Sequence, residues 1–226
     1  MNPKQSAAER AVSYIRDGMT VGLGTGSTSA YAIHALGRRF QAEALSLRCI
    51  ATSSESETLG QSYGLPFVAF ETVTSLDITI DGADEVDPAF RLIKGAGGAL
   101  VREKIVAGAT RTEIIVVDEH KVKDALGARA LPVAILPYAW QWTQAKIEDR
   151  FGIPAPRRLA SADAPFLSDD GLYTLDLEFG APLPAPDGLE QRLKTIVGVV
   201  EVGLFVGLCQ RLIVGFDDGR IEEKTH

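Results

Sequence analysis

The sequence predicts an α/β protein: a Rossmann-like, mostly parallel sheet with helices on both faces, together with a smaller α+β domain. Short apolar runs alternate with helical patterns over the first 120 residues, as in folds where a helix connects each pair of parallel strands. A glycine-rich loop separates the first apolar run from the helical pattern after it. Near residue 127 the composition of the chain changes: eight prolines fall between residues 132 and 186, so we expect a second domain there.

Four apolar runs predict the buried strands of the main sheet. They cover residues 20–23, 47–51, 78–80 and 114–117. Between these runs, apolar residues recur at spacings of three and four, which predicts helices. We expect helices over residues 6–16, after the glycine loop to about residue 36, from a cap at Ser53 or Ser54 to near Gly64, and over residues 99–107.

The proline-rich part of the chain predicts the smaller domain. We expect a helix at 138–151, short strands near 157–161 and 172–178, and strands over 199–206 and 211–216, the last returning to the main sheet. The predicted division assigns residues 1–126 and 207–226 to the Rossmann-like catalytic domain. Residues 127–206 form the smaller α+β domain, a lid or oligomerisation domain, in which Trp140 and Trp142 are expected in the core or an interface.

Composition excludes several functional classes. Of the 226 residues, 46% are hydrophobic and 23% charged, enough apolar surface for a core, which excludes intrinsic disorder. The formal charge of −7 repels polyanions, so nucleic acid and anionic membranes are not expected partners. Cys49 and Cys209 lie too far apart to indicate a disulfide framework or a zinc cluster. Without a signal peptide or a run of roughly 20 apolar residues, we expect a cytoplasmic protein.

The first candidate site is the loop Gly22-Leu23-Gly24-Thr25-Gly26-Ser27-Thr28. Glycines let the backbone approach an anion closely, and the following helix offers unpaired amides at its N-terminus. A dinucleotide fingerprint would need glycine at position 27, where this chain has serine, and a Walker loop would need lysine after its last glycine. Both nucleotide motifs are excluded, whereas a phosphate site and a purely structural glycine turn both stay open.

The second candidate is the acidic segment Asp81-Gly82-Ala83-Asp84-Glu85-Val86-Asp87, at the end of a predicted strand. Ligands of open parallel sheets bind beyond the carboxyl ends of the strands, so Asp81 and Asp84 are well placed for function. A solvated acidic loop is the structural alternative. A calcium or magnesium site is disfavoured because the spacing does not match an EF-hand loop and a positive residue follows soon after.

A third segment, Lys94-Gly95-Ala96-Gly97-Gly98, leads into a helix that contains Glu103. Lys94 can neutralise the neighbouring aspartates and stabilise negative charge that develops on a substrate oxygen. Glu103 stands between Arg102 and Lys104, a pattern that by itself is typical of a solvated helix face. Lys121 follows another predicted strand and could reach an anion.

In this order and spacing, these segments resemble the type A ribose-5-phosphate isomerases. The resemblance is carried by residues 24–28, 81–85 and 94–104, and it extends through Leu131-Pro132-Val133 to the run 199–205. It implies interconversion of ribose 5-phosphate and ribulose 5-phosphate through an enediolate, in the non-oxidative pentose phosphate pathway, without cofactor or metal. It also implies a small phosphosugar as the binding partner and a dimer or tetramer of this chain.

The resemblance assigns a role to each matching residue. Glu103 matches the catalytic base, Asp81 and Asp84 match acids that assist ring opening and proton movement, and Lys94 matches the lysine beside them. Lys121 matches a group that holds the substrate phosphate, and Lys4 is given the same role from its spacing to the glycine loop. The other implied substrate-binding positions lie in the three loops: Thr25, Gly26, Ser27, Thr28, Gly82, Ala83, Gly95, Ala96 and Gly97.

Two departures from the family pattern lie in or near the smaller domain. Residues 128–134 replace a run richer in proline, and the segment after Phe205 is a few residues shorter. They bear on the lid and on subunit contacts more than on the chemistry. The alternatives are a sugar-phosphate sensor, an amino-sugar-phosphate deaminase and an acyl-CoA transferase.

Overall fold

The computed structural model describes residues 2–162 and 164–225, and the chain divides into two compact units. The first unit comprises Met1–Ala83, Arg102–Val122 and Gly207–His226, and the second comprises Asp84–Val101 and Lys123–Val206. The acidic and glycine-rich segments that follow Ala83 therefore cluster with the second unit. The division into a catalytic domain and a smaller domain at residues 126 and 206 stays a prediction.

A six-stranded sheet forms the centre of the first unit, in the order β12-β11-β6-β3-β1-β2. The strands are β1 (Thr20–Leu23), β2 (Arg48–Ala51), β3 (Ile78–Gly82), β6 (Glu113–Asp118), β11 (Arg211–Gly215) and β12 (Ile221–Thr225). Strands β2, β1, β3, β6 and β11 run parallel, and β12 pairs antiparallel with β11. The predicted mostly parallel sheet is confirmed, as is the return of the last apolar run to it.

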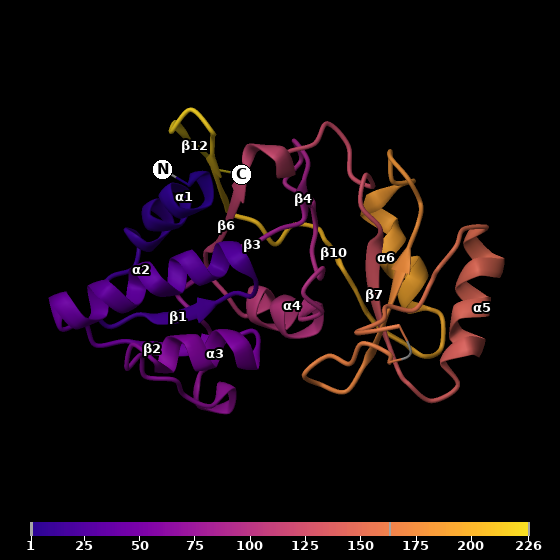
Figure 1. Cartoon of the computed structure of the whole chain (residues 1–226), viewed down its shortest axis with the longest axis horizontal. Coiled ribbons are helices and arrows are strands. Elements are labelled where there is room, and N and C mark those ends of the chain that lie inside the picture. Colours follow the sequence, from indigo (N-terminus) through magenta and orange to yellow (C-terminus); the bar gives the residue numbers. More distant parts are fainter. Residues whose placement is uncertain (1, 163, 226) are drawn as a thin grey trace. The chain divides into compact units, whose positions relative to one another are not determined.

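Helices cover both faces of this sheet. On one face, α1 (Pro3–Val12) and α2 (Ser27–Glu43) lie side by side and bury small and apolar residues against alternate residues of the strands (Figure 1). On the other face, Val106 of α4 (Leu100–Gly108) packs with Ile50 and Leu76. Neighbouring strand residues point to opposite faces, which is why Cys49 belongs to the first core and Ile50 to the second.

The helix starts follow from their capping residues. The Asn2 side chain accepts a hydrogen bond from Lys4 N, and Pro3 occupies the first turn, so α1 begins three residues before the apolar pattern suggests. In α3 (Ser54–Gln61), the cap is Ser53, whose hydroxyl accepts from Ser56 N. Of the two serines that the sequence left open, Ser53 is therefore the cap.

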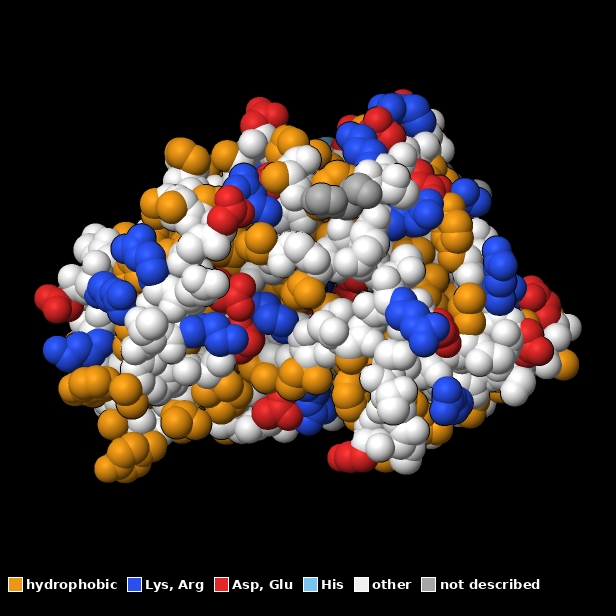
Figure 2. All heavy atoms as spheres, turned by 180° about the vertical axis from the view of Figure 1, so that it is seen from behind, with side chains coloured by type: hydrophobic (Ala, Val, Ile, Leu, Met, Phe, Trp, Pro, Cys, Tyr) orange, Lys and Arg blue, Asp and Glu red, His pale blue; other side chains and the backbone are white. Residues whose placement is uncertain are grey.

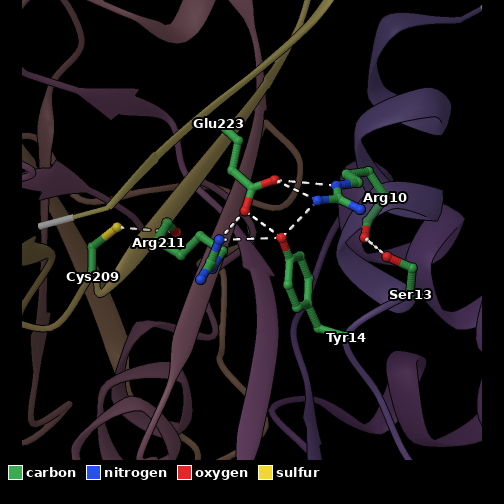
Figure 3. A network of polar contacts seen from close by, with 6 residues as sticks. All are labelled: Arg10, Ser13, Tyr14, Cys209, Arg211 and Glu223. Carbon is green, nitrogen blue, oxygen red and sulfur yellow. Dashed lines mark hydrogen bonds and ion pairs between the residues drawn. The ribbon is translucent and has the colours of Figure 1, made fainter.

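A polar network around Glu223 of β12 ties α1 to the sheet (Figure 3). The Glu223 carboxylate accepts hydrogen bonds from Arg10 Nε at 3.1 Å, from Arg10 Nη2 at 3.0 Å and from the Tyr14 hydroxyl, and it pairs with Arg211 of β11. The guanidinium carbons of Arg10 and Arg211 lie 4.9 and 4.5 Å from the centre of the Tyr14 ring. Two cations thus share one carboxylate, which helps to fix the helix whose first turn carries Lys4.

Among its described residues, the second unit has two antiparallel sheets, and the helices α5 (Trp140–Phe151) and α6 (Pro186–Lys194) pack in its core. One sheet has the order β8-β7-β9 and the other β10-β5-β4. Their strands are β4 (Glu85–Val86), β5 (Leu92–Ile93), β7 (Leu131–Ile135), β8 (Tyr173–Leu177), β9 (Val199–Val202) and β10 (Leu204–Phe205). The two helices contribute Ile147, Leu189 and Leu193 to this core.

Several elements of this unit differ from the sequence prediction. Residues 157–161 form only isolated bridges, Arg157 with Leu175 and Leu159 with Pro165, instead of a strand. Strand β7 was not expected; it is the central strand of its sheet, although its second residue, Pro132, lacks an amide donor. The predicted strand 199–206 is divided at Gly203 between two sheets, and a Cβ there would lie 2.3 Å from the Lys94 carbonyl oxygen.

Within residues 2–162 and 164–225, none of the helices combines the length and the hydropathy that a transmembrane helix requires.

Candidate active site

Asp81 lies at the carboxyl end of β3 and is 1% exposed. Its Oδ1 atom accepts hydrogen bonds from Thr25 N at 3.2 Å, Ser29 Oγ at 3.1 Å and Gly82 N at 2.7 Å. The loop after β1, the first turn of α2 and the last residue of β3 therefore all position one carboxylate. A buried acid needs such donors, since burying an unpaired charge is costly.

The glycine loop comes very close to this acid. A Cβ on Gly24 would lie 2.0 Å from Asp81 Oδ1 and 2.2 Å from Asp81 Cγ, so a residue with a side chain does not fit there without moving Asp81. Gly26 adopts a φ of 92° at the start of α2, with nothing near its missing side chain. Gly24 is thus required by the carboxylate, whereas Gly26 is required by the backbone conformation.

A cluster of polar groups surrounds the start of α2. Lys4 Nζ lies 3.4 Å from Ser27 Oγ and 3.6 Å from Asp118 Oδ2. Gly215 permits this, because a Cβ there would lie 2.0 Å from the Pro3 carbonyl oxygen and would push the start of α1 away. Lys4 and Ser27, which the sequence connected only by spacing, are thus brought together beside the amides of the α2 N-terminus.

Lys121 and Thr28 occupy the same unit. Lys121 is the last residue of the short 3-10 helix Glu119–Lys121, which follows β6. The Asp118 side chain caps this helix by accepting a 3.0 Å hydrogen bond from His120 N. Thr28 packs near Gly82, where an added Cβ would lie 3.5 Å from Thr28 Cβ. Thr25 Oγ1 forms a 2.7 Å hydrogen bond with Thr52 Oγ1 at the end of β2. These predicted residues of the first unit thus lie at the carboxyl ends of its parallel strands.

Glu103 lies in the first turn of α4 and is 5% exposed. The pattern of charged neighbours suggested a solvated helix face, but the structure buries this side chain, so that alternative is wrong. The partial positive charge at a helix N-terminus favours an ionised carboxylate in the first turn. Glu103 is therefore a buried acid in the unit that also holds Asp81.

Asp84 and the segment 94–98 lie in the second unit, where they contact one another directly. Asp84 Oδ2 accepts a 2.9 Å hydrogen bond from Ala96 N, and Asp84 N donates to the Ile93 carbonyl oxygen at 2.8 Å. Lys94 is 2% exposed, and its Nζ lies 5.5 Å from the centre of the Phe205 ring. The structure thus brings Asp84, Lys94 and Ala96 into one compact arrangement.

The other acids of the segment 81–87 are structural. Glu85 is fully buried, and its carboxylate accepts hydrogen bonds from Gly127 N at 2.7 Å and Arg129 N at 2.5 Å. Asp87 Oδ2 accepts a hydrogen bond from Arg91 Nε at 2.7 Å. Burial lowers the pKa of Arg91, but the hydrogen bond and charge of Asp87, with those of Asp187, outweigh this and raise it. These buried acids rule out a wholly solvated loop.

Sequence reasoning missed three residues that hold the candidate site residues. Ser29 donates to Asp81 from α2, and Arg158 and Asp176 hold the segment 94–98 in the second unit. Ser29 could have been found as a polar residue on the buried face of a helix. Arg158 and Asp176 carry no local signal, because their partners lie far away in the chain.

One group of potential metal ligands occurs near Lys121. Side-chain atoms of Glu119, His120 and Asp217 lie within 4.8 Å of one another. His120 Nε2 lies 3.2 Å from Asp217 Oδ2, and Asp217 N donates to Glu119 Oε1 at 2.9 Å. These contacts already link two surface loops, so the arrangement is explained without an ion.

Comparison with known proteins identifies close relatives over nearly the whole chain. A family model described as ribose 5-phosphate isomerase A (phosphoriboisomerase A) matches residues 48–219. Ribose-5-phosphate isomerase A 1 of Oceanobacillus iheyensis is 43% identical over 215 residues, which cover 95% of this chain and 95% of that protein. Ribose-5-phosphate isomerase A of Bacillus mycoides is 42% identical over 219 residues, 97% of this chain and 98% of that protein.

Solved structures show the same fold. The structure of ribose 5-phosphate isomerase A from Methanocaldococcus jannaschii matches with a TM-score of 0.93 at 33% identity, covering 100% of this chain and 99% of that one. A D-ribose-5-phosphate isomerase in complex with phospho-erythronic acid matches with a TM-score of 0.94 at 34% identity, covering 100% of both chains. The chain is similar to these proteins throughout its length.

Proposed function

Because the chain belongs to the ribose 5-phosphate isomerase A family, we propose that it interconverts ribose 5-phosphate and ribulose 5-phosphate through an enediolate, with Glu103 as the base. The family makes it an isomerase of the pentose phosphate pathway, and the roles of individual residues are the proposal. The observation that carries it is the pair of buried carboxylates, Glu103 at 5% and Asp81 at 1% exposure, in the unit that also holds Lys4 and the glycine loop.

An aldose-ketose isomerase removes a weakly acidic proton from the carbon beside a carbonyl group and returns a proton to the neighbouring carbon. One carboxylate can do both, first as base and then as acid, and a positioned base typically contributes about 10²–10⁴-fold. Glu103 suits this task because it is withdrawn from water and lies on a helix rather than on a loop. A rigid element keeps a catalytic group in one geometry.

The enediolate carries negative charge that must be stabilised as it forms. We assign this to Lys94, with backbone amides of the glycine-rich loops. Each such donor is worth about 2.7–4 kcal/mol where it has been removed from other enzymes. Lys94 is almost fully buried, so its charge is poorly screened by water.

Ribose 5-phosphate is mainly a closed ring, and opening it requires proton transfer at the ring oxygen. We assign this step to Asp81, with Asp84 assisting proton movement among the hydroxyl groups. The fixed position of Asp81 supports the assignment, because three donors hold one of its oxygens and leave its orientation defined.

The phosphate is assigned to Lys4, Lys121 and the start of α2. Lys4 already lies within 3.4 Å of Ser27 Oγ, and a helix N-terminus favours an anion. Phosphate binding far from the reacting carbons orients them and adds to turnover as well as to affinity. The relative solved with phospho-erythronic acid is consistent with such a ligand, because this acid combines a phosphate with a planar carboxylate that resembles an enediolate.

The direct test is an isomerase assay on purified, metal-stripped protein with ribose 5-phosphate. Activity that persists in chelator supports the cofactor-free route, and its loss would contradict it. Parallel assays with glucosamine 6-phosphate and a CoA ester distinguish the isomerase from a deaminase and an acyl-CoA transferase. We propose that the reaction takes place in the cytoplasm, where buried thiols such as those of Cys49 and Cys209 stay reduced.

We also propose that two copies of this chain associate through an exposed apolar face of the second unit. The face is formed by Leu136, Tyr138, Trp142 and Val197, which are 49%, 91%, 51% and 76% exposed. A 2.9 Å hydrogen bond from Leu136 N to the Gly198 carbonyl oxygen joins two of its segments. Figure 2 shows hydrophobic side chains gathered over the α5 region, at the lower left.

The charges beside this face favour a second copy as the occupant. Lys146, Asp149 and Arg150 of α5 line the same hollow as Trp142 and Val197, so both signs lie next to the apolar side chains. In a twofold dimer the same patch of both copies meets, so the cations of one copy can pair with the acid of the other. Light scattering should find a dimer, and Tyr138→Asp should shift it to monomer. A wild-type monomer, or a variant that stays dimeric, would contradict this surface.

A further inference from the structure

The segment Lys94–Gly98 needs support from outside itself. Gly95 and Gly98 adopt φ angles of 105° and 81°, and glycines have no side chains with which to anchor a loop. The segment carries the carbonyl and amide groups that adjoin Lys94 and Asp84. Any catalytic role of these two residues therefore depends on what holds this backbone in place.

Arg158 holds it through two carbonyl groups. Its Nη1 atom donates to the Gly95 oxygen at 2.8 Å and to the Ala96 oxygen at 2.9 Å. Its Nε and Nη2 atoms donate to the two carboxylate oxygens of Asp176 at 3.0 and 2.5 Å. The side chains of Arg158 and Asp176 are only 16% and 26% exposed. The Arg158 guanidinium thus forms a bidentate ion pair with Asp176, which orients its Nη1 atom towards the loop.

The backbones of both partners are fixed as well. Arg158 N donates to the Thr174 carbonyl oxygen at 2.8 Å, and Asp176 N donates to the Pro156 carbonyl oxygen at 2.9 Å. The Phe166 ring packs beside the pair, with its centre 5.7 Å from the guanidinium carbon. This ring also fills the space at Gly98, where a Cβ would lie 2.2 Å from Phe166 Cζ. Arg158 is therefore a rigid support.

The peptide group between Gly95 and Ala96 links Arg158 to Asp84. Its carbonyl oxygen accepts from Arg158, and its N–H donates to Asp84 Oδ2 at 2.9 Å. A cation at the oxygen end polarises the peptide and strengthens donation from the nitrogen end, as in other hydrogen-bonded chains. The guanidinium therefore acts on the carboxylate without touching it.

We infer that Arg158 is a positioning residue of the isomerase: through the Gly95–Ala96 peptide it fixes the Asp84 carboxylate and the backbone beside Lys94. The inference rests on the proposed function, which gives Asp84 and Lys94 their roles. Lysine cannot replace it, because a single ammonium group lacks the fork that binds Asp176 and both carbonyl oxygens together.

Arg158→Gln and Arg158→Lys test the inference, with Arg129→Gln as the matched control. Arg129 lines the same hollow of about 210 Å³, beside Asp84, Ala96 and Asp176, and its side chain is exposed. Both Arg158 variants should lower kcat by about 10–100-fold, the cost of misplacing a catalytic group by roughly 1 Å, while KM changes by less than about 3-fold. Arg129→Gln should leave both constants near the wild-type values.

A double variant shows whether Arg158 acts through Asp84. If it does, adding Arg158→Gln to Asp84→Asn should lower kcat by far less than it does in the wild-type background. Thermal unfolding confirms that the variants are folded, and Arg158→Lys keeps the test valid if Arg158→Gln is unstable. Full additivity, an effect confined to KM, or equal losses in Arg129→Gln would each overturn the inference. An inactive wild-type protein would instead refute the proposed function.

Discussion

Replacing Gly24 with alanine tests whether the position of Asp81 matters for turnover. The added Cβ would lie 2.0 Å from Asp81 Oδ1 and 2.6 Å from Asp81 Cβ, so the acid must move. Overfilling a packed site costs about 1–3 kcal/mol. Weakening hydrogen bonds to a charged acceptor costs a further amount of about 1.5–3 kcal/mol. We expect a total loss of about 3–5 kcal/mol in the free energy of unfolding.

Gly22→Ala provides the matched control, two residues earlier in the same chain segment. Its Cβ would also lie 2.0 Å from another atom, but this atom is Thr79 Oγ1, whose hydrogen-bond partner is Thr110 Oγ1. Neither threonine is a candidate site residue. The loss of stability should be similar, about 2–4 kcal/mol, because the steric conflict is the same and the hydrogen bond is neutral. The two variants thus separate damage to the fold from damage to the site.

Thermal unfolding and kcat, measured at a temperature where both variants are folded, distinguish these effects. At about 2–4 °C per kcal/mol for a chain of this size, Gly24→Ala should lower Tm by roughly 6–20 °C. Its kcat should fall at least about 10-fold, whereas Gly22→Ala should stay within about 3-fold of wild type. Wild-type turnover in Gly24→Ala, or equal losses in both variants, would refute a catalytic role for Asp81.

The remaining predictions concern other parts of the first unit. Lys121→Ala should raise KM for ribose 5-phosphate more than it lowers kcat, and steady-state kinetics that show the reverse would remove it from phosphate binding. Cys49 and Cys209 are buried and should react with a thiol reagent only after denaturation; burial raises the pKa of Cys49 from 9.0 to about 12. Because the folded state keeps this thiol protonated, its contribution to the free energy of unfolding should be complete below pH 9 and should disappear as the pH rises towards 12. Unfolding measured as a function of pH checks this. Glu223→Gln should lower the free energy of unfolding by about 1–2 kcal/mol in denaturant titration, because Arg211 loses its partner, with kcat unchanged.

The sequence predicted the main sheet well because its signals are local. Each parallel strand is a short apolar run, and the glycine loop and the Ser53 cap stand directly beside the elements they begin. The close approach of Gly24 to Asp81 was not predictable in detail, since it depends on the pairing of β1 with β3. The sequence pattern indicated that the loops after β1 and β3 lie at the same edge of the sheet, and the fold shows which of their atoms approach each other.

The second unit was harder because local rules and tertiary contacts disagree there. Pro132 argues against a central strand, yet β7 is held by pairing with both β8 and β9. Likewise, Arg158 lies 63 residues from Gly95 in the chain, so no spacing pattern connects them. The charged neighbours of Glu103 in the sequence suggested a solvated side chain. It is buried because α4 packs onto the sheet.

The turnover of Glu103→Gln tests the central claim most directly, because the amide keeps the size of the side chain and removes its ability to accept a proton. Two rates are measured: isomerisation, and exchange of the C2 hydrogen of ribose 5-phosphate in deuterated water. In the folded variant, both rates should fall by at least about 100-fold. A variant with wild-type unfolding behaviour that still exchanges this hydrogen at the wild-type rate would contradict the role of Glu103 as the base.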